Sequence, residues 1–475
     1  MGQIHMKISR RDSLSGLLIG GAAVGLTACE KPPTHTNTKT SKTNLPILPA
    51  SPTSLLLNQT RAAEIMEQEK VDLIICANPI NIYYLTNQRP MTYRLGMNDF
   101  SYATLSSKPM APPTFMTGRY DLYMGGAFDT NLSDLLNFKM ASFPVDPDSF
   151  AKLSEPNDII NAPAFEGFYP RLHDIHKLPK HTQRRREKDA PVLEAEHYAS
   201  VEAALIKQIL ETDMPNRTVA IDASKIRQTL AKTDLDLRIV DGERLVKKIR
   251  LQKTAAELEL VRYATNANAR AVRAAAKTVR DGATLQEVRG EFIRECGNHM
   301  NRPVYMAIDF VIPELIRGEI KNGRSFMVDC VSEFQGYHGD FGRTVCAGAP
   351  TTEMQAIIDA LSHVWDRMMP ILKAGTKYSE LFALSTKLFA ETKVDAGFAI
   401  NPHSVGLNHT DEPSKNDFGF WEKDDIELVE NMVLSVDMPV LDNGLGGSAH
   451  LEDLVLIGKD GPELLNTSDD RFIVV

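Results

Sequence analysis

The sequence predicts an α+β protein of two domains, and three observations support this prediction. The chain has 475 residues, of which 43% are hydrophobic, and this is enough for a large buried core divided between domains. Strand-like and helix-like segments alternate between residues 54 and 250, which is typical of an α/β domain. After residue 250 a long amphipathic helix precedes several separated strand-like segments, which indicates an α+β layout.

Residues 1–29 resemble an export signal. Ser9-Arg10-Arg11 precedes an uncharged, apolar and Gly-rich stretch, which is typical of a secretory signal and similar to a twin-arginine signal. Leu26-Thr27-Ala28-Cys29 resembles a bacterial lipobox, so we expect a periplasmic lipoprotein with lipid on Cys29. Residues 30–53, rich in Thr, Lys, Pro and Ser, would form a flexible tether. The alternative is a chance cysteine in an ordinary signal.

Two short apolar runs are the predicted strands of the first domain, which we place at residues 54–250. Residues 71–76 form one run, which ends at Asn78-Pro79, and residues 218–221 form the other. Both have the length and composition of buried strands. Between them, residues 85–190 are rich in Pro, Met and aromatic side chains, and we expect long loops that reach toward another domain or subunit.

A long helix is predicted to open the second domain, which we place at residues 251–475. Thr254 and Glu257 form a capping-box pattern, and apolar residues then follow at helical spacing as far as Val279. Gly282 is the predicted stop signal. The strand-like segments that follow are residues 326–331, 337–346, 432–440 and 453–457.

The charge of the chain argues against nucleic acid as a partner. The net charge is −9, whereas phosphate binding needs clustered Lys and Arg. The one basic run, residues 180–188, is interpreted as a solvated loop or helix face. No apolar stretch after the signal is long enough to cross a bilayer, so membrane attachment is expected only through lipid on Cys29.

Two aspartates interrupt strand-like segments of the second domain. Asp329 ends the apolar run Phe-Met-Val-Asp, and Asp340 follows 11 residues later. Because a buried carboxylate without a partner is costly, each needs a cation or hydrogen-bond donors. One alternative is a structural pair of aspartates that Arg343 and backbone donors satisfy.

Three later residues favour a metal site instead. His403, Asp437 and Glu452 each lie in a segment that is otherwise apolar. Four carboxylates and one imidazole suit two divalent metal ions, and Mn, Co, Fe(II) or Zn are the candidates. Without metal, each close carboxylate pair would repel by about 4 kcal/mol at about 4 Å and an effective dielectric of about 20. Two ions close together activate a bridging water and stabilise a tetrahedral intermediate.

The order and spacing of these five residues resemble the metal-binding set of the prolidase, aminopeptidase P and creatinase family. The resemblance runs from about residue 250 to the C-terminus, and a weaker one covers residues 54–250, where 71–75 and 81–85 are similar to the opening of the family's first domain. It implies a C-terminal pita-bread catalytic domain behind a smaller α/β creatinase-type domain, and a possible homodimer. The ligands that it implies, with Asp340 and Glu452 as bridges, are Asp329, Asp340, His403, Asp437 and Glu452.

The resemblance also implies a dinuclear-metal-dependent hydrolase of the Xaa-Pro dipeptidase or aminopeptidase type, which acts on a small peptide or amide. Asp437 stands where the family usually has Glu. The family's two substrate-binding histidines would fall near Ile312 and at Thr410. His409 is adjacent to the second position but out of register, and Asp411 takes the place of a Glu. The alternatives are therefore creatinase-like hydrolysis, a lyase reaction on the same scaffold, or an inactive binding module.

His450 is the main candidate for a proton-handling group. It lies two residues before Glu452, and side chains at i and i+2 of a strand share a face. The family commonly has Arg there, whereas an imidazole can donate to a developing oxyanion or carry a proton near neutral pH. His338 shares the face of Asp340 by the same argument, and His409 would need a local bulge to point inward. A purely structural histidine is the alternative reading of His450.

Overall fold

The computed structural model describes most of the chain after residue 45. The export signal, the lipobox with Cys29 and most of the tether and of the basic run at 180–188 lie outside the described residues. Pro46–Val475 form one compact unit. No helix in the described part combines the length and the apolar character needed to span a bilayer. The described ranges are 46–97, 100–118, 121, 135–141, 177, 179–180, 183, 196–231, 233–309, 318–414, 425–441, 447–466 and 470–475.

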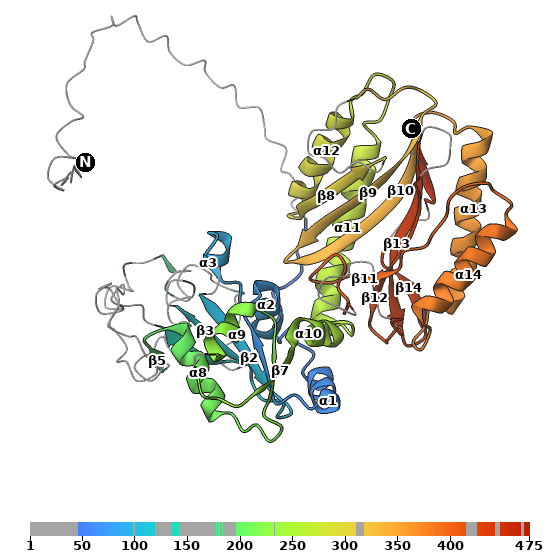
Figure 1. The fold of residues 1–475 in the computed structure, drawn as a ribbon. Coiled ribbons are helices and arrows are strands. Elements are labelled where there is room, and N and C mark those ends of the chain that lie inside the picture. The colour runs from blue at the N-terminus through green and yellow to red at the C-terminus, as the bar shows by residue number, and fades with distance from the viewer. Residues whose placement is uncertain are drawn as a thin grey trace, which may run out of the picture. The chain divides into compact units, whose positions relative to one another are not determined.

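A seven-stranded sheet organises the first part of the unit (Figure 1). Its order is β5-β4-β3-β2-β1-β6-β7, with β1 parallel to β6 and antiparallel to β2. The predicted strands at 71–76 and 218–221 are confirmed as β1 and β6. The elements are α1 (Gln59–Glu69), β1 (Leu73–Cys76), α2 (Pro79–Thr86), α3 (Met91–Arg94), β2 (Ser101–Ser106), β3 (Thr114–Gly118), β4 (Asn137–Ala141), β5 (His197–Tyr198), α8 (Val201–Glu211), β6 (Thr218–Ile221), α9 (Ser224–Leu230), β7 (Arg238–Asp241) and α10 (Gly242–Arg250).

The prediction of long loops over residues 85–190 is wrong where this stretch is described. It contributes β2, β3 and β4 to the sheet. The prolines at 109, 112 and 113 fall between β2 and β3, where they break no ladder hydrogen bond. Tyr102, Leu105, Phe115 and Met116 are buried, so the aromatic and Met-rich composition reflects a sheet core.

A second sheet of eight strands organises the chain after residue 300. Its order is β11-β12-β13-β10-β9-β8, with β14 on β13 and β15 on β10. All four predicted strand-like segments are confirmed. The elements are α11 (Ala255–Ala276), α12 (Leu285–Asn298), β8 (Arg302–Ile308), β9 (Ser325–Phe334), β10 (Tyr337–Cys346), α13 (Thr352–Met368), a 3-10 turn η3 (Met369–Ile371), α14 (Tyr378–Glu391), β11 (His403–Ser404), β12 (Val433–Val440), β13 (Ala449–Gly458), β14 (Gly461–Leu464) and β15 (Phe472–Val474).

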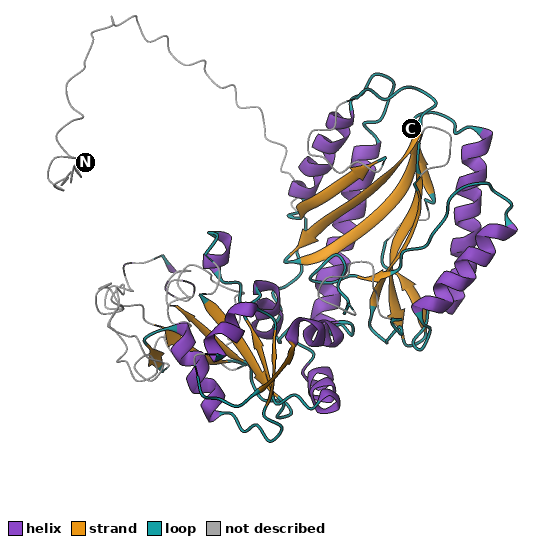
Figure 2. Ribbon diagram, in the orientation of Figure 1, coloured by secondary structure: helices purple, strands orange, loops and turns teal. Residues whose placement is uncertain are grey.

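Helices pack along this second sheet (Figure 2). Helix α11 contacts β9 and β10, α12 contacts β8, and α13 contacts β13. The predicted capping box is present, because the Thr254 side chain accepts from the Glu257 backbone while the Glu257 carboxylate accepts from Thr254. The helix ends at Ala276, before Gly282, whose φ of +75° suits the turn that follows.

A tight hairpin joins β9 to β10 and sets the register of the second sheet. Phe334 pairs with Tyr337 across two turn residues, Gln335 and Gly336, whose φ angles are +51° and +82°. Positive φ at both positions is the requirement of the type I′ turn that matches strand twist. The hairpin places Asp329 opposite Gly342.

Candidate metal centre

Three carboxylates lie in one row across four neighbouring strands. Asp329 on β9 pairs with Gly342 on β10, Gly342 pairs with Glu452 on β13, and Glu452 pairs with Asp437 on β12. Residues in register on adjacent strands share a face of the sheet. Asp340 lies two residues before Gly342 and therefore points to the same face. The sheet register thus brings all four predicted carboxylates together.

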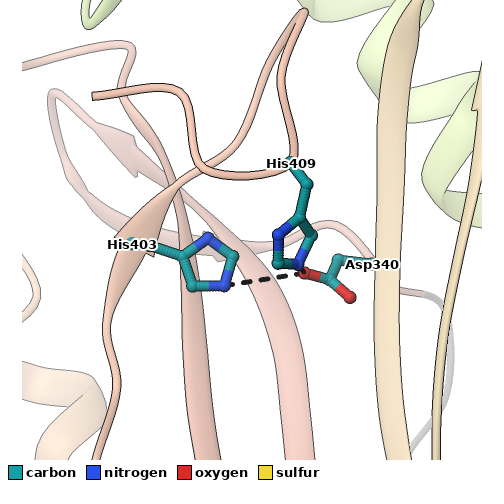
Figure 3. Close-up of side chains that lie close together, drawn as sticks. All are labelled: Asp340, His403 and His409. Carbon is teal, nitrogen blue, oxygen red and sulfur yellow. Dashed lines mark ion pairs between the residues drawn. The ribbon is translucent and has the colours of Figure 1, made fainter. Parts of the chain in front are cut away.

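Two histidines, one on β11 and one in the loop that follows it, complete this cluster. His403 on β11 has its Nε2 atom 3.7 Å from Asp340 Oδ2 and 4.0 Å from Glu452 Oε1. His409 has its Nε2 atom 3.0 Å from the same oxygen of Asp340. Figure 3 shows both imidazoles turned toward the Asp340 carboxylate, with their ring centroids 4.5 Å apart. His409 therefore points inward although it lies outside a strand.

Three overlapping groups of side chains have the geometry to hold a metal ion. Within each group, the candidate ligand atoms lie within 4.8 Å of one another. Every residue predicted as a ligand belongs to at least one group. The groups are Asp340, His403 and His409; Asp329, His450 and Glu452; and His403, Asp437 and Glu452.

Asp340 is a fully buried carboxylate, with an exposed fraction of 0%. Among the described residues, the side chains that pair with it are the imidazoles of His409 and His403, at 3.0 and 3.7 Å from Oδ2, and no Arg or Lys does so. The Oε2 atom of Glu452 lacks a hydrogen-bond partner in the described part of the chain, whereas its Oε1 atom accepts from Ser435 at 2.6 Å. Carboxylates buried in an apolar environment are costly unless they are paired, and a bound cation would stabilise both groups.

The alternative that Arg343 satisfies the two aspartates is wrong. Arg343 donates to both oxygens of Asp453, at 2.8 and 2.9 Å, and to the carbonyl of Glu452. Arg343 lies three residues after Asp340 on β10, and side chains alternate along a strand, so the Arg343 side chain lies on the opposite face of the sheet.

Proton affinities in the cluster are strongly perturbed. Burial, and then the charge of Asp340, raise the pKa of Asp329 to about 7. Burial also raises the pKa of Glu452 well above its ordinary value, and the charge of Asp340 adds to this. Burial would raise the pKa of Asp340 as well, but the neighbouring His409 and His403 lower it overall. These shifts arise because several carboxylates lie close together in a buried site, and a bound cation would offset their repulsion.

The three candidate proton-handling histidines have different surroundings. His450 lies on the cluster face, and its Nε2 atom is 2.7 Å from Asp437 Oδ1 and 3.9 Å from Glu452 Oε2. His409 lies beside Asp340, as described above. His338 instead has its Nδ1 atom 3.1 Å from the carbonyl oxygen of Gly406 and belongs to none of the three groups. The acid–base roles expected for these residues stay predictions.

Tyr305 is a site residue that the sequence analysis missed. Its hydroxyl lies 3.1 Å from His409 Nε2 and donates to Asp329 Oδ1 at 3.4 Å. Burial raises the pKa of Tyr305 well above its ordinary value, and the charge of Asp329 adds to this effect. Tyr305 therefore stays protonated near neutral pH and is a hydrogen-bond donor in the cluster.

Asp411 anchors the turn that carries His409. Its Oδ1 atom lies 2.7 Å from Arg250 Nη2 and its Oδ2 atom lies 4.0 Å from Lys253 Nζ, and all three side chains are buried. Asp411 Oδ2 also accepts from the backbone of Leu407 at 3.2 Å. Asp411 therefore positions the loop, and its carboxylate contacts none of the cluster side chains among the described residues.

Comparison with known proteins identifies the domain that contains the cluster. Residues 259–459 match the profile of metallopeptidase family M24. This domain is a member of the M24 family. The Xaa-Pro dipeptidase of Pyrococcus furiosus is 24% identical over 239 residues, which cover 48% of this chain and 67% of that protein. The Xaa-Pro aminopeptidase of Escherichia coli is 24% identical over 263 residues, which cover 48% of this chain and 59% of that protein.

Solved structures confirm the fold of the M24 domain and of the residues before it. The prolidase of Pyrococcus horikoshii superimposes with a TM-score of 0.60 at 16% identity, covering 87% of this chain and 99% of that one. The X-Pro aminopeptidase of Thermotoga maritima gives a TM-score of 0.58 at 16% identity, with 88% and 99% covered. The predicted α+β class and pita-bread fold are therefore confirmed, and so is the resemblance to the prolidase and aminopeptidase P family.

The donors of the M24 domain fit divalent cations. Enzymes of this family use divalent metals, and the cluster here supplies carboxylate oxygens and imidazole nitrogens, the donors that Mn, Co, Fe(II) and Zn accept. The fit is best at Asp340, which is fully buried and lies within 4.8 Å of two imidazole nitrogens that could bind the same ion.

Proposed function

We propose that the chain is a dinuclear-metal-dependent hydrolase that cleaves an amide bond in a small peptide of the Xaa-Pro type. The observation that carries the proposal is Asp340, a fully buried carboxylate that lies among three other carboxylates and that, of the described cationic side chains, only the imidazoles of His403 and His409 approach. In this proposal Asp340 and Glu452 would be shared by the two ions. Asp329 would hold one ion, while His403 and Asp437 would hold the other, in keeping with the grouping of their ligand atoms.

Residues of the chain hold these carboxylates in place and supply a proton donor. When bound, the ions would activate a water molecule and polarise the carbonyl of the scissile bond. Ser435 donates to Glu452 Oε1, so that Oε2 remains for a cation. Asp437 is held at both oxygens, because Asn401 donates to Oδ2 at 3.2 Å and His450 Nε2 lies 2.7 Å from Oδ1. The protonated Tyr305 can donate a hydrogen bond to the oxygen of a bound substrate.

The test measures metal content and turnover together. The purified chain, loaded with Mn or Zn, should hold about two ions and should release proline from Xaa-Pro dipeptides. The variant Asp340→Asn should lose both properties, while Asp359→Asn, on the exposed side of α13, is the matched control. Full metal retention in a variant that carries both Asp340→Ala and Glu452→Ala would contradict the proposal.

A different reaction on the same metal scaffold is the second candidate. Thr410 stands at one family histidine position, and no His occurs between His299 and His338. This difference favours creatinase-like hydrolysis or a lyase reaction over peptide cleavage. Product analysis with Xaa-Pro dipeptides, small non-peptide amides and guanidino compounds separates these reactions. A chain that binds metal but turns over none of them would favour the third candidate, an inactive binding module.

We also propose that the protein is exported and attached to the membrane through lipid on Cys29. The support is the lipobox-like sequence after an apolar run. Cys29→Ser should release a soluble periplasmic form, and wild-type protein that fractionates as soluble chain with a free N-terminus would contradict this. A homodimer is proposed by analogy with relatives, and light scattering of the purified chain tests it.

A further inference from the structure

We propose that His409 and His450 are additional metal ligands, so that the site has three imidazoles and prefers Zn, Fe(II) or Co over Mn. The inference rests on the proposed dinuclear site and concerns what binds its ions. His409 would join the ion held by His403, and His450 would join the ion held by Asp329. Both residues belong to groups of ligand atoms that include predicted metal ligands.

The position of His409 suits coordination. Two atoms that bind one ion at about 2.1 Å lie about 3.0–3.4 Å apart, depending on whether the ion is octahedral or tetrahedral. His409 Nε2 lies 3.0 Å from Asp340 Oδ2, and His403 Nε2 lies 3.7 Å from the same oxygen. The His409 nitrogen therefore lies at the separation of two ligands that share an ion, and the His403 nitrogen lies about 0.3 Å beyond that range, with both rings turned toward the same carboxylate (Figure 3).

The turn before His409 is built to hold it there. A Cβ atom at Gly406 would overlap the carboxylate of Asp411, so the backbone passes close to this anchor. Asp411 is fixed by the buried Arg250 and by the backbone of Leu407. Such an anchored loop can fix the orientation of His409 although the residue does not lie in a strand. A metal ligand requires a fixed orientation of this kind.

His450 reaches the cluster through a space that a glycine provides. A Cβ atom at Gly342 would overlap the His450 ring and would lie 2.9 Å from Glu452 Oε2. His450 Nε2 lies 2.7 Å from Asp437 Oδ1 and 3.9 Å from Glu452 Oε2. The ring thus occupies the middle of the carboxylate row, with 1% of its surface exposed.

His450 also offsets the short side chain of Asp437. The related family usually has Glu at this position, and Asp is one methylene shorter. In the register of β12 and β13, Asp437 lies opposite Glu452, and Pro439 lies opposite His450. A longer carboxylate at residue 437 would extend into the space that the His450 ring fills. The short Asp437 side chain therefore leaves room for the imidazole, whose Nε2 atom lies 2.7 Å from Asp437 Oδ1.

The three imidazoles change the expected choice of metal. Imidazole nitrogen suits Zn, Fe, Cu and Ni, whereas carboxylate and water oxygens suit Mg, Ca and Mn. With only His403 as a nitrogen donor the site would be almost entirely oxygen-lined. With His409 and His450 added, it has four carboxylates and three imidazoles, and borderline ions are favoured.

X-ray absorption spectroscopy of the metal-loaded full chain tests the inference directly, because imidazole rings give a characteristic outer-shell scattering. Three imidazoles over two ions give about 1.5 rings per ion, whereas His403 alone gives about 0.5. The double variant His409→Ala, His450→Ala should return the count to about 0.5. It should also lower Zn affinity about 100-fold or more, while Mn affinity falls less.

The variant His363→Ala is the matched control, because His363 is a partly exposed histidine on α13. It should keep the wild-type ring count. A wild-type count of about 0.5 with two ions bound would overturn the inference and leave the proposed function standing. A chain that binds no divalent ion would overturn both. A double variant that keeps two ions and the wild-type Zn affinity, but loses turnover, would assign proton transfer to these histidines instead.

Discussion

The buried carboxyl group of Glu257 should make the protein less stable as the pH rises. Glu257 is the capping-box residue of α11, with 1% of its surface exposed, and it accepts from the backbone of Thr254 and from the hydroxyl of Tyr337. Burial raises the pKa of Glu257 from 4.5 to about 7, although the neighbouring Lys253 opposes this shift. The substitution Glu257→Gln tests how much the ionisation of this buried carboxyl group destabilises the protein, because Gln can take the same role in a capping box.

The sign and size follow from proton linkage. Between pH 4.5 and about 7 the folded chain keeps a proton that the unfolded chain has released, so the free energy of unfolding falls as the pH rises. The shift of about 2.5 pKa units corresponds to a decrease of about 3 kcal/mol in the free energy of unfolding, and this decrease is complete above pH 7. Gln cannot lose a proton. The variant should therefore match the wild type near pH 4.5 and exceed it by up to about 3 kcal/mol at pH 8.

Urea unfolding followed by circular dichroism at several pH values measures this difference. Glu287→Gln is the matched control, because Glu287 has the same capping-box role on α12 but is exposed. Hydrogen bonds from Thr284 lower the pKa of Glu287, so this control should lose stability relative to the wild type as the pH rises. A Glu257→Gln variant whose advantage does not grow between pH 5 and pH 8 would refute the reasoning.

Three further predictions concern the sheet and its ions. Gly342→Ala should lower metal content several-fold in elemental analysis, because the new Cβ would displace the His450 ring; unchanged content would contradict the close packing described above. Arg343→Met should cost about 3–5 kcal/mol in urea unfolding, because Asp453 would be left buried and unpaired, and a loss below 1 kcal/mol would argue against it. Removal of bound metal with a chelator should lower the melting temperature by several degrees, since ions that bind only the folded chain stabilise it, and an unchanged melting temperature would exclude a filled site.

The residues of the cluster that lie in strands were predictable from the sequence. The spacing of 11 residues between Asp329 and Asp340, with a two-residue turn between their strands, brings both to one face. Strand alternation likewise placed His450 beside Glu452. The same rule excludes Arg343 as their partner, because residues three apart in a strand face opposite sides.

Strand alternation could not establish the inward orientation of the predicted candidate His409, and it gave no sign of Tyr305, because both lie where the strand pattern is interrupted. His409 lies in the loop after β11, so a register argument based on strand alternation does not apply to it. Tyr305 follows an irregularity in the pairing of β8 with β9, between Pro303 and Tyr305. The face of the sheet on which the Tyr305 side chain lies therefore depends on a bulge that no local sequence signal reveals. The anchoring of Asp411 by Arg250 joins residues 161 positions apart, and such long-range pairs are set by the tertiary fold.

Adjacent residues of β13 show why a cation is needed on one face of this sheet. Asp453 and Glu452 are equally buried, with 1% and 2% of their surfaces exposed, and both have raised pKa values because of burial. Asp453 faces Arg343, which donates to both of its oxygens and itself stacks on Phe341. Glu452 faces Asp340 and its neighbours, where the described residues offer no Arg or Lys within ion-pair distance. Asp453 is thus neutralised by Arg343 of β10, whereas Glu452 has only the imidazoles of His403 and His450 within 4.0 Å among the described cationic side chains. This is the arrangement expected of a metal site rather than of a structural charge network.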